Sequence, residues 1–194
     1  MGLLIVGLLV FLGLHSIRML AGGWRNRMLQ RYGEAVYKGI FSLLSLLGLA
    51  LVVYGFGLAR EAPVVLWVPP PALRHAASLL TLVAFVLLMA AYVPRNAIKA
   101  HWHHPMVLSV KTWALAHLLA NGNVAHLVLF GAFLIWSVCN FIAARRRDRA
   151  AGTRYPAATL AGTITMLVVG VATWALFAFQ LHGWLIGIRP FSLN

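Results

Sequence analysis

Histidine is the residue type in this sequence that is best suited to chemistry. The chain has eight histidines among 194 residues but only three acidic residues, Glu34, Glu61 and Asp148. So few carboxylates argue against paired-carboxylate catalysis and against a carboxylate proton relay. The single cysteine, Cys139, excludes an intramolecular disulfide, a zinc finger or a CxxC redox site. Imidazole nitrogens are therefore the candidate ligands of this chain.

Two histidines, His15 and His117, fall inside apolar stretches. An ionisable side chain at membrane depth is costly, and it normally faces a bundle interior, a partner or a cofactor. Two imidazoles from different helices are good axial donors to haem iron. Trp113 and Ala114 lie about one helical turn before His117, and the small Ala114 leaves room for a flat ligand. We predict that His15 and His117 bind the iron of haem b; the alternative is that each imidazole bonds a carbonyl of an adjacent helix.

Other side chains remain alternatives or additions to this site. Three histidines are predicted at the outer ends of the apolar stretches: His75, His126 and His182. From the rise per residue of a helix and the thickness of the bilayer core, His15 and His117 are expected to differ in membrane depth by roughly 10 Å. The three outer histidines are closer in depth to His117, so each is an alternative to His15 as the second ligand. Lys111, in the same segment as His117, either extends toward the cytoplasm along its aliphatic stem or meets an anionic group such as a haem propionate.

A third group of candidate ligands is the sequence AHWHHPM, with His101, His103, His104 and Met106. Imidazole and thioether groups at this spacing could bind copper or nickel. The alternative is a solvated run of histidines at the membrane surface.

Long apolar stretches must position these residues. The chain is 62% hydrophobic and 10% charged, whereas a soluble domain has about 25% charged residues. Stretches of span length recur at residues 2–21, 39–59, 75–93, 124–143 and 159–181. The segment 105–120, begun by Pro105 and ended by a left-handed stop at Asn121-Gly122, predicts a shorter helix of about 24 Å. We predict an all-α, polytopic bundle of about six transmembrane helices.

The basic residues orient the predicted bundle. Twelve of the 16 Lys and Arg residues lie in three alternate links, and only Arg60, Arg74 and Arg189 lie in the links on the opposite side. Under the positive-inside rule the basic links face the cytoplasm, and both termini are periplasmic. The net charge of +13 thus reflects topology, with the lipid bilayer as partner, and not nucleic-acid binding. The link 22–38 is predicted to be interfacial, and residues 145–155 a solvated turn.

Several motifs resemble the NnrU family of bacterial inner-membrane proteins. They are GLHSIR at 13–18, RYGEAVYKGIFSLLSL at 31–46, VVLWVPP at 64–70, the stretch 90–122 with HPMVLSVKTWALAHLLANG, LFGAFLIWSV at 129–138 and HGWLIGIRP at 182–190. The resemblance implies one domain over residues 1–194, with its core at 1–143 and an extra span at 159–185. It also implies a role in nitrite and nitric oxide metabolism, part of denitrification, as a redox, sensing or isomerase-like component with redox or denitrification partners.

The chain is more distantly similar to the plastid 15-cis-zeta-carotene isomerase, which carries haem b. Its ligand histidines match His15 and His117, but Ala114 stands where that enzyme has a cysteine, so a switch between thiolate and imidazole ligation is not available here. One alternative is a non-catalytic transporter or assembly factor for nitrogen-oxide respiration. A methyltransferase-like enzyme is another alternative, since the sequence HPM at residues 104–106 is similar to the RHPxY motif of membrane methyltransferases. Here His103 replaces the arginine, and the C-terminal acidic signature is missing.

Overall fold

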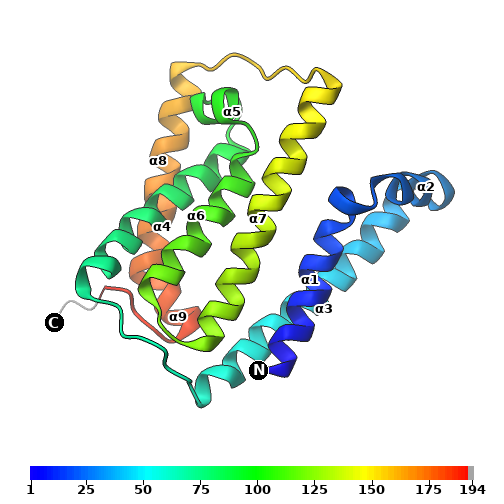
Figure 1. The fold of residues 1–194 in the computed structure, drawn as a ribbon. Helices are drawn as coiled ribbons and strands as arrows, with labels where there is room; N and C mark the ends of the chain where they lie inside the picture. Colours follow the sequence, from blue (N-terminus) through cyan, green and yellow to red (C-terminus); the bar gives the residue numbers. More distant parts are fainter. Residues whose placement is uncertain (192–194) are drawn as a thin grey trace.

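The computed structural model describes residues 1–191, which form a bundle of helices (Figure 1). The long helices are α1 (Gly2–Leu20), α3 (Glu34–Glu61), α4 (Pro71–Tyr92), α7 (Val124–Ala151) and α8 (Leu160–Leu176). The shorter ones are α2 (Gly22–Tyr32), α5 (Ala97–Trp102), α6 (Pro105–Ala120), the π-helical turn η1 (Phe177–Leu181) and α9 (His182–Ile186). Five helices, with α8, η1 and α9 counted as one, are long and apolar enough to cross a membrane. The predicted all-helical membrane class is confirmed.

The short helix α6 has the predicted bounds but a different end. It begins at Pro105 and ends at Ala120, as the proline indicated. The predicted left-handed stop is wrong, because Asn121 is extended, with φ −134° and ψ 131°. The carbonyl of Gly122 instead accepts a hydrogen bond from the backbone N–H of Trp67 at 3.1 Å, and a Cβ on Gly122 would overlap the Trp67 carbonyl. Glycine is needed here for close backbone approach.

Helix α7 is longer than predicted. Residues 145–151, expected in a solvated turn, are helical, and the helix ends at Ala151, before Gly152, whose φ is +60°. The segment ARRRDRAA is rich in alanine and arginine, which are strong helix formers, and a left-handed glycine is the usual helix stop. The extension places Arg145 and Asp148 on a rigid helix.

Glycines set the packing of α1 on α3. A Cβ on Gly7 would lie 2.6 Å from the backbone nitrogen of Val52, and a Cβ on Gly48 would lie 3.0 Å from that of Phe11. Such small-residue contacts let helix backbones approach closely in a bilayer. The two helices are antiparallel in this register, so His15 comes to lie against the turn of α3 that precedes Gly48.

The other helices pack around α6 and α7. Helix α6 lies between α4 and α7, α8 packs on α4, and α1 contacts α7. A buried core joins α1, α3, α6 and α7: Leu4, Leu8, Val52, Ala114, Leu129 and Phe130. The buried hydroxyl of Ser109 on α6 donates to the carbonyl of Ala84 on α4 at 2.8 Å. The α1–α3 pair runs beside α7 near this core and diverges from it toward the end that carries α2 (Figure 1).

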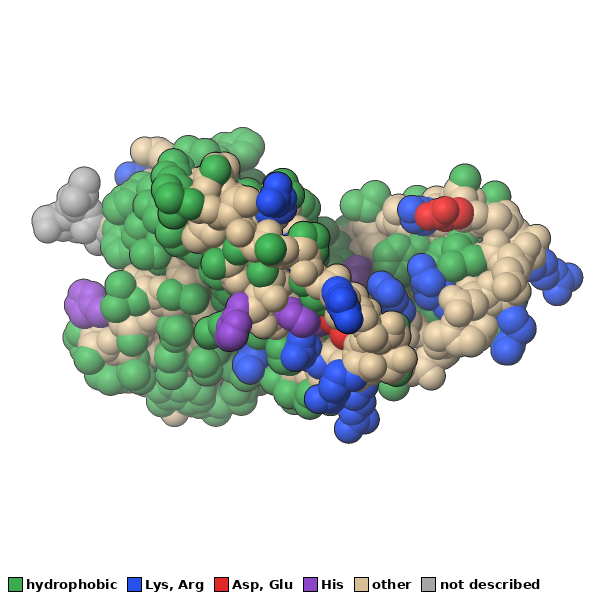
Figure 2. All heavy atoms as spheres, turned by 90° about the horizontal axis from the view of Figure 1, so that it is seen from above, with side chains coloured by type: hydrophobic (Ala, Val, Ile, Leu, Met, Phe, Trp, Pro, Cys, Tyr) green, Lys and Arg blue, Asp and Glu red, His purple; other side chains and the backbone are tan. Residues whose placement is uncertain are grey.

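Basic side chains gather at the end of the molecule that carries α2, α5 and the link 152–159 (Figure 2). This is the end to which the three basic links were assigned from the sequence. Thr159 caps α8 there, and its backbone N–H donates to the carbonyl of Arg95 at 2.7 Å. The link between α7 and α8 is thereby tied to the turn between α4 and α5.

Candidate functional site

His15 lies on α1 where this helix packs between α3 and α7. Its Nδ1 donates to the carbonyl of Phe11 at 2.7 Å. The imidazole centroid is 5.2 Å from the ring of Phe41 on α3 and 6.2 Å from that of Trp136 on α7. Within residues 1–191 its Nε2 has no hydrogen-bond partner. Metal-ligating histidines are typically held in this way, with one nitrogen fixed by a carbonyl and the other available to the metal.

Two unsatisfied polar groups accompany His15. The indole N–H of Trp136 and the hydroxyl of Ser45 are buried, and neither has a hydrogen-bond partner in the described part of the chain. Ser45 lies one turn after Phe41 on α3, and both Phe41 and Trp136 flank the imidazole. A buried unsatisfied donor costs about 1–3 kcal/mol, and native proteins rarely keep one. A ligand with acceptor atoms bound beside His15 could supply a partner to such a group.

His117 on α6 has a similar local geometry. Its Nδ1 donates to the carbonyl of Trp113 at 2.8 Å. The imidazole stacks on Phe130 of α7 at 4.4 Å and an interplanar angle of 25°, and the Trp113 ring is 5.1 Å away. Ala114 is fully buried in the core, where its small side chain allows neighbouring helices to approach α6. Trp113 and Ala114 therefore lie beside His117 as the helical spacing predicted.

The structure does not bring His15 and His117 into contact. Between them lie the aromatic rings of Phe11, Phe133 and Trp113. The Phe133 ring is 6.0 Å from that of Phe11 and 5.6 Å from that of Trp113. A series of neighbouring aromatic rings thus links the two imidazoles. The donor atoms suit haem iron, but one haem held by both would have to fit among the rings of Phe11, Phe133 and Trp113.

The depth difference between the two imidazoles agrees with the one expected from the sequence. His15 packs near Trp136 of α7, and His117 packs on Phe130 of the same helix. These two α7 residues are six positions apart, which corresponds to about 9 Å of helix rise. The expected difference was roughly 10 Å.

Two of the alternative ligands, His126 and His182, lie near His117. Both interact electrostatically with it, and the His126 ring is 5.8 Å from Phe130. His126 Nδ1 is 2.5 Å from Asn123 Oδ1, and His182 Nδ1 donates to a backbone carbonyl at 2.6 Å. All three imidazoles are thus held through Nδ1, which leaves Nε2 for a ligand.

The remaining candidates are more exposed. Lys111 lies on an exposed part of α6, and His75 is exposed in the first turn of α4. The copper or nickel site considered for His101, His103, His104 and Met106 gains no support, because the described residues contain no group of three His, Cys, Asp or Glu side chains that could hold a metal ion.

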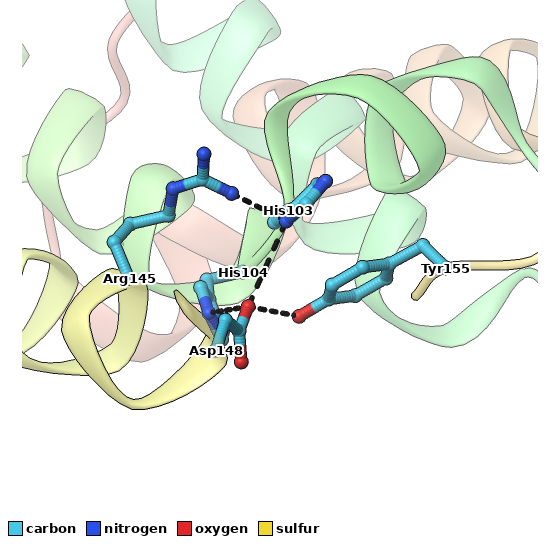
Figure 3. Close-up of polar contacts among 5 residues, drawn as sticks. All are labelled: His103, His104, Arg145, Asp148 and Tyr155. Carbon is cyan, nitrogen blue, oxygen red and sulfur yellow. Dashed lines mark hydrogen bonds and ion pairs between the residues drawn. The ribbon is translucent and has the colours of Figure 1, made fainter. Parts of the chain in front are cut away.

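His103 and His104 instead meet a carboxylate (Figure 3). The Asp148 Oδ2 atom accepts hydrogen bonds from His104 Nε2 and from the Tyr155 hydroxyl, each at 2.8 Å, and lies 3.6 Å from His103 Nδ1. The guanidinium of Arg145 hydrogen-bonds His103. We refer to these five residues as the Asp148 clasp. It joins the α5–α6 turn, the end of α7 and the link 152–159, so neither histidine belongs to a solvated run.

Sequence reasoning missed the clasp because Asp148 lay in a segment predicted to be a solvated turn. The available signal was that this is the only aspartate of the chain. The clasp holds strained backbone, since His103 and His104 have φ of 60° and 41°, which costs about 1–2 kcal/mol per non-glycine residue. Burial and the hydrogen bond to Asp148 raise the pKa of Tyr155 to about 12, so the phenol remains a donor at neutral pH.

Comparison with known proteins gives one match. A family model described as NnrU protein matches residues 3–190. No curated protein and no solved structure matches the chain significantly. The matched range includes every candidate ligand described above and the Asp148 clasp.

Proposed function

This chain belongs to the NnrU family, and we propose that it binds haem b in the bacterial inner membrane and acts in nitrite and nitric oxide metabolism. The observation that supports this most is the polar set around His15, where an imidazole with an unengaged Nε2 lies beside two buried donors without partners in residues 1–191. Family membership supports the link to nitrogen oxides. Bound haem would supply reversible one-electron chemistry and an affinity for diatomic gases.

The chain's own residues have defined tasks in this proposal. The Phe11 carbonyl fixes the ring orientation of His15 and increases the basicity of its Nε2. The rings of Phe41 and Trp136 surround the imidazole with apolar material that limits the access of water. The indole N–H of Trp136, which has no partner in residues 1–191, would be available to donate to an acceptor atom of the ligand.

His117 is paired with His15 in this proposal, and His126 and His182, which lie near His117, are the alternatives to His15 as its partner. If His117 binds together with His15, the aromatic rings near both imidazoles, Phe133 among them, would have to make room for the ligand. If two histidines held the haem, the protein would suit electron transfer, whereas a haem held by His15 alone would suit gas sensing.

An optical spectrum of the purified protein, expressed with ample haem, tests the proposal. We expect a Soret band that shifts on reduction with dithionite and that is lost in His15→Ala. Trp136→Phe keeps an aromatic ring at this position but removes the unsatisfied N–H, and we expect it to lower haem retention several-fold. His101→Ala, at an exposed position, is the matched control and should keep the full band. A colourless wild-type protein would refute the proposal and favour the transporter or assembly-factor alternative.

The spin state of the oxidised protein identifies the second ligand. Two imidazoles predict a low-spin electron paramagnetic resonance signal, and one imidazole predicts a high-spin signal. Conversion from low to high spin in His117→Ala but not in His126→Ala would assign the pair. A low-spin signal that survives in His117→Ala would exclude His117 as the second ligand.

A further inference from the structure

A pocket of about 220 Å³ lies between α1, α2 and α3. Its wall is made of apolar and aromatic side chains, among them Leu14, Ile17, Trp24, Met28, Tyr37 and Phe41. Trp24 is 43% exposed and Val36, also in the wall, is 52% exposed, so the pocket opens to the surface of the bundle. An apolar pocket of this kind in a membrane protein suits a hydrocarbon chain.

Positive charge lies at the edge of this pocket. The Arg25 guanidinium lies 5.7 Å from the ring centroid of Tyr37, and the Arg31 guanidinium lies 5.4 Å from that of Tyr32. Both tyrosines belong to the pocket wall. Two arginines are thereby positioned beside an apolar cavity.

The surrounding sequence supplies little negative charge to neutralise them. Residues 18–38 contain five basic side chains and one acidic side chain, Glu34. Glu34 is paired with Lys38 at 2.6 Å. The blue side chains around α2 in Figure 2 belong to this basic surface. A ligand that complements it must combine an apolar chain with a negative head.

We propose that this pocket binds an anionic phospholipid. Part of one acyl chain lies among the apolar side chains of α1, α2 and α3, and the phosphate lies at Arg25 and Arg31. The apolar wall would accept a chain from any lipid, so the two arginines provide the selectivity. Each basic residue near the surface favours an anionic lipid about fivefold. A free phosphate ion lacks the apolar part and would leave the pocket unfilled.

Quenching of tryptophan fluorescence by brominated lipids tests this proposal. The full-length protein is reconstituted in phosphatidylcholine bilayers that contain the same mole fraction of either dibromo-phosphatidylglycerol or dibromo-phosphatidylcholine. The phosphatidylcholine arm measures ordinary contact between Trp24 and the bilayer. We expect additional quenching with phosphatidylglycerol, equivalent to at least a fivefold local enrichment, and its loss in Trp24→Phe.

Charge variants establish which residues select the lipid. The double variant Arg25→Gln/Arg31→Gln should quench equally with both lipids. The control Arg146→Gln/Arg149→Gln removes the same charge from exposed positions of α7 at the same end of the molecule and should keep the preference. Raising the salt concentration with the wild-type protein should reduce the preference, a readout that does not depend on the folding of any variant.

Several results would overturn the proposal. Equal quenching of the wild-type protein by the two lipids would show that the pocket does not select anionic lipid. A preference that persists in Arg25→Gln/Arg31→Gln, or that disappears equally in the α7 control, would place the selectivity elsewhere. None of these outcomes depends on haem, so this proposal and the proposed function fail or stand separately.

Discussion

At the level of single residues, the intramembrane imidazoles are fixed by their own helices. His15 and His117 each donate through Nδ1 to the carbonyl four residues earlier, at 2.7 and 2.8 Å. The alternative considered from the sequence was a bond to a carbonyl of an adjacent helix. In the observed geometry the imidazoles do not tie helices together. Each ring instead directs its Nε2 away from its own helix.

The Asp148 clasp makes the ionisation of Tyr155 dependent on the fold. We expect an absorbance titration of wild-type protein to contain a tyrosinate step near pH 12 that is missing in Tyr155→Phe, because burial and the bond to Asp148 raise the pKa of Tyr155 to about 12. The ordinary tyrosine value is about 10, so the neutral phenol stabilises the fold below pH 10. This contribution is lost between about pH 10 and 12, since the unfolded chain then binds fewer protons.

The stabilities of the wild-type protein and of Tyr155→Phe should therefore converge as the pH rises. Wild-type protein should lose stability more steeply than Tyr155→Phe above pH 10, as measured by thermal unfolding in detergent at several pH values. If the tyrosinate step that Tyr155→Phe lacks lies at about pH 10 instead of pH 12, Tyr155 is not held by Asp148.

At the level of the elements, the contact of α1 with α3 determines where His15 lies. The helices meet backbone to backbone at glycine positions, and Gly55 packs against the backbone of Leu4 in the same register as Gly7 against Val52. This register carries His15 to Phe41. A side chain added at the contact must separate the helices.

Alanine substitutions test this packing. Gly7→Ala should destabilise the protein by about 1–3 kcal/mol, the usual cost of overpacking, because its Cβ would lie 2.6 Å from the Val52 backbone nitrogen. Gly13→Ala on the same helix is the matched control, since nothing lies within 4 Å of its Cβ. It should be neutral or slightly stabilising, because alanine favours the helix. Thermal unfolding in detergent measures both, and equal effects would contradict the described register.

At the level of the whole molecule, both ends of the described chain lie at one end of the bundle. Leu4 of α1 packs against Gly55 near the end of α3. Arg60, in the last turn of α3, donates to the carbonyl of Ile186 in α9 at 3.1 Å. The basic residues of α2, α5 and the α7–α8 link are at the opposite end (Figure 2). This separation agrees with a membrane orientation set by charge.

Reporter fusions test the orientation. Alkaline phosphatase fused after residue 194 should be active, because this enzyme folds in the periplasm, and green fluorescent protein at the same point should be dark. Insertion of green fluorescent protein into the link 152–159 should give fluorescence, since the positive-inside rule places this link in the cytoplasm. The reverse pattern would show that the charge bias does not set the topology.

The sequence by itself determined the properties that depend on local composition. The apolar stretches were long enough to predict membrane helices, and Pro105 marked the start of α6. The positions of Trp113 and Ala114 beside His117 followed from helical spacing alone. The depth difference between His15 and His117 also followed, because rise per residue is a constant of the helix.

Only the tertiary structure decided which distant residues meet. The bond between His104 and Asp148 joins positions 44 residues apart, and it depends on an α7 that continues beyond the apolar stretch. The buried donors of Ser45 and Trp136 lack partners in residues 1–191 only because of how α3 and α7 pack, and the ring of Phe133 lies between the two intramembrane histidines for the same reason. Such contacts are set by helix register and by the angles between helices, which local spacing does not contain.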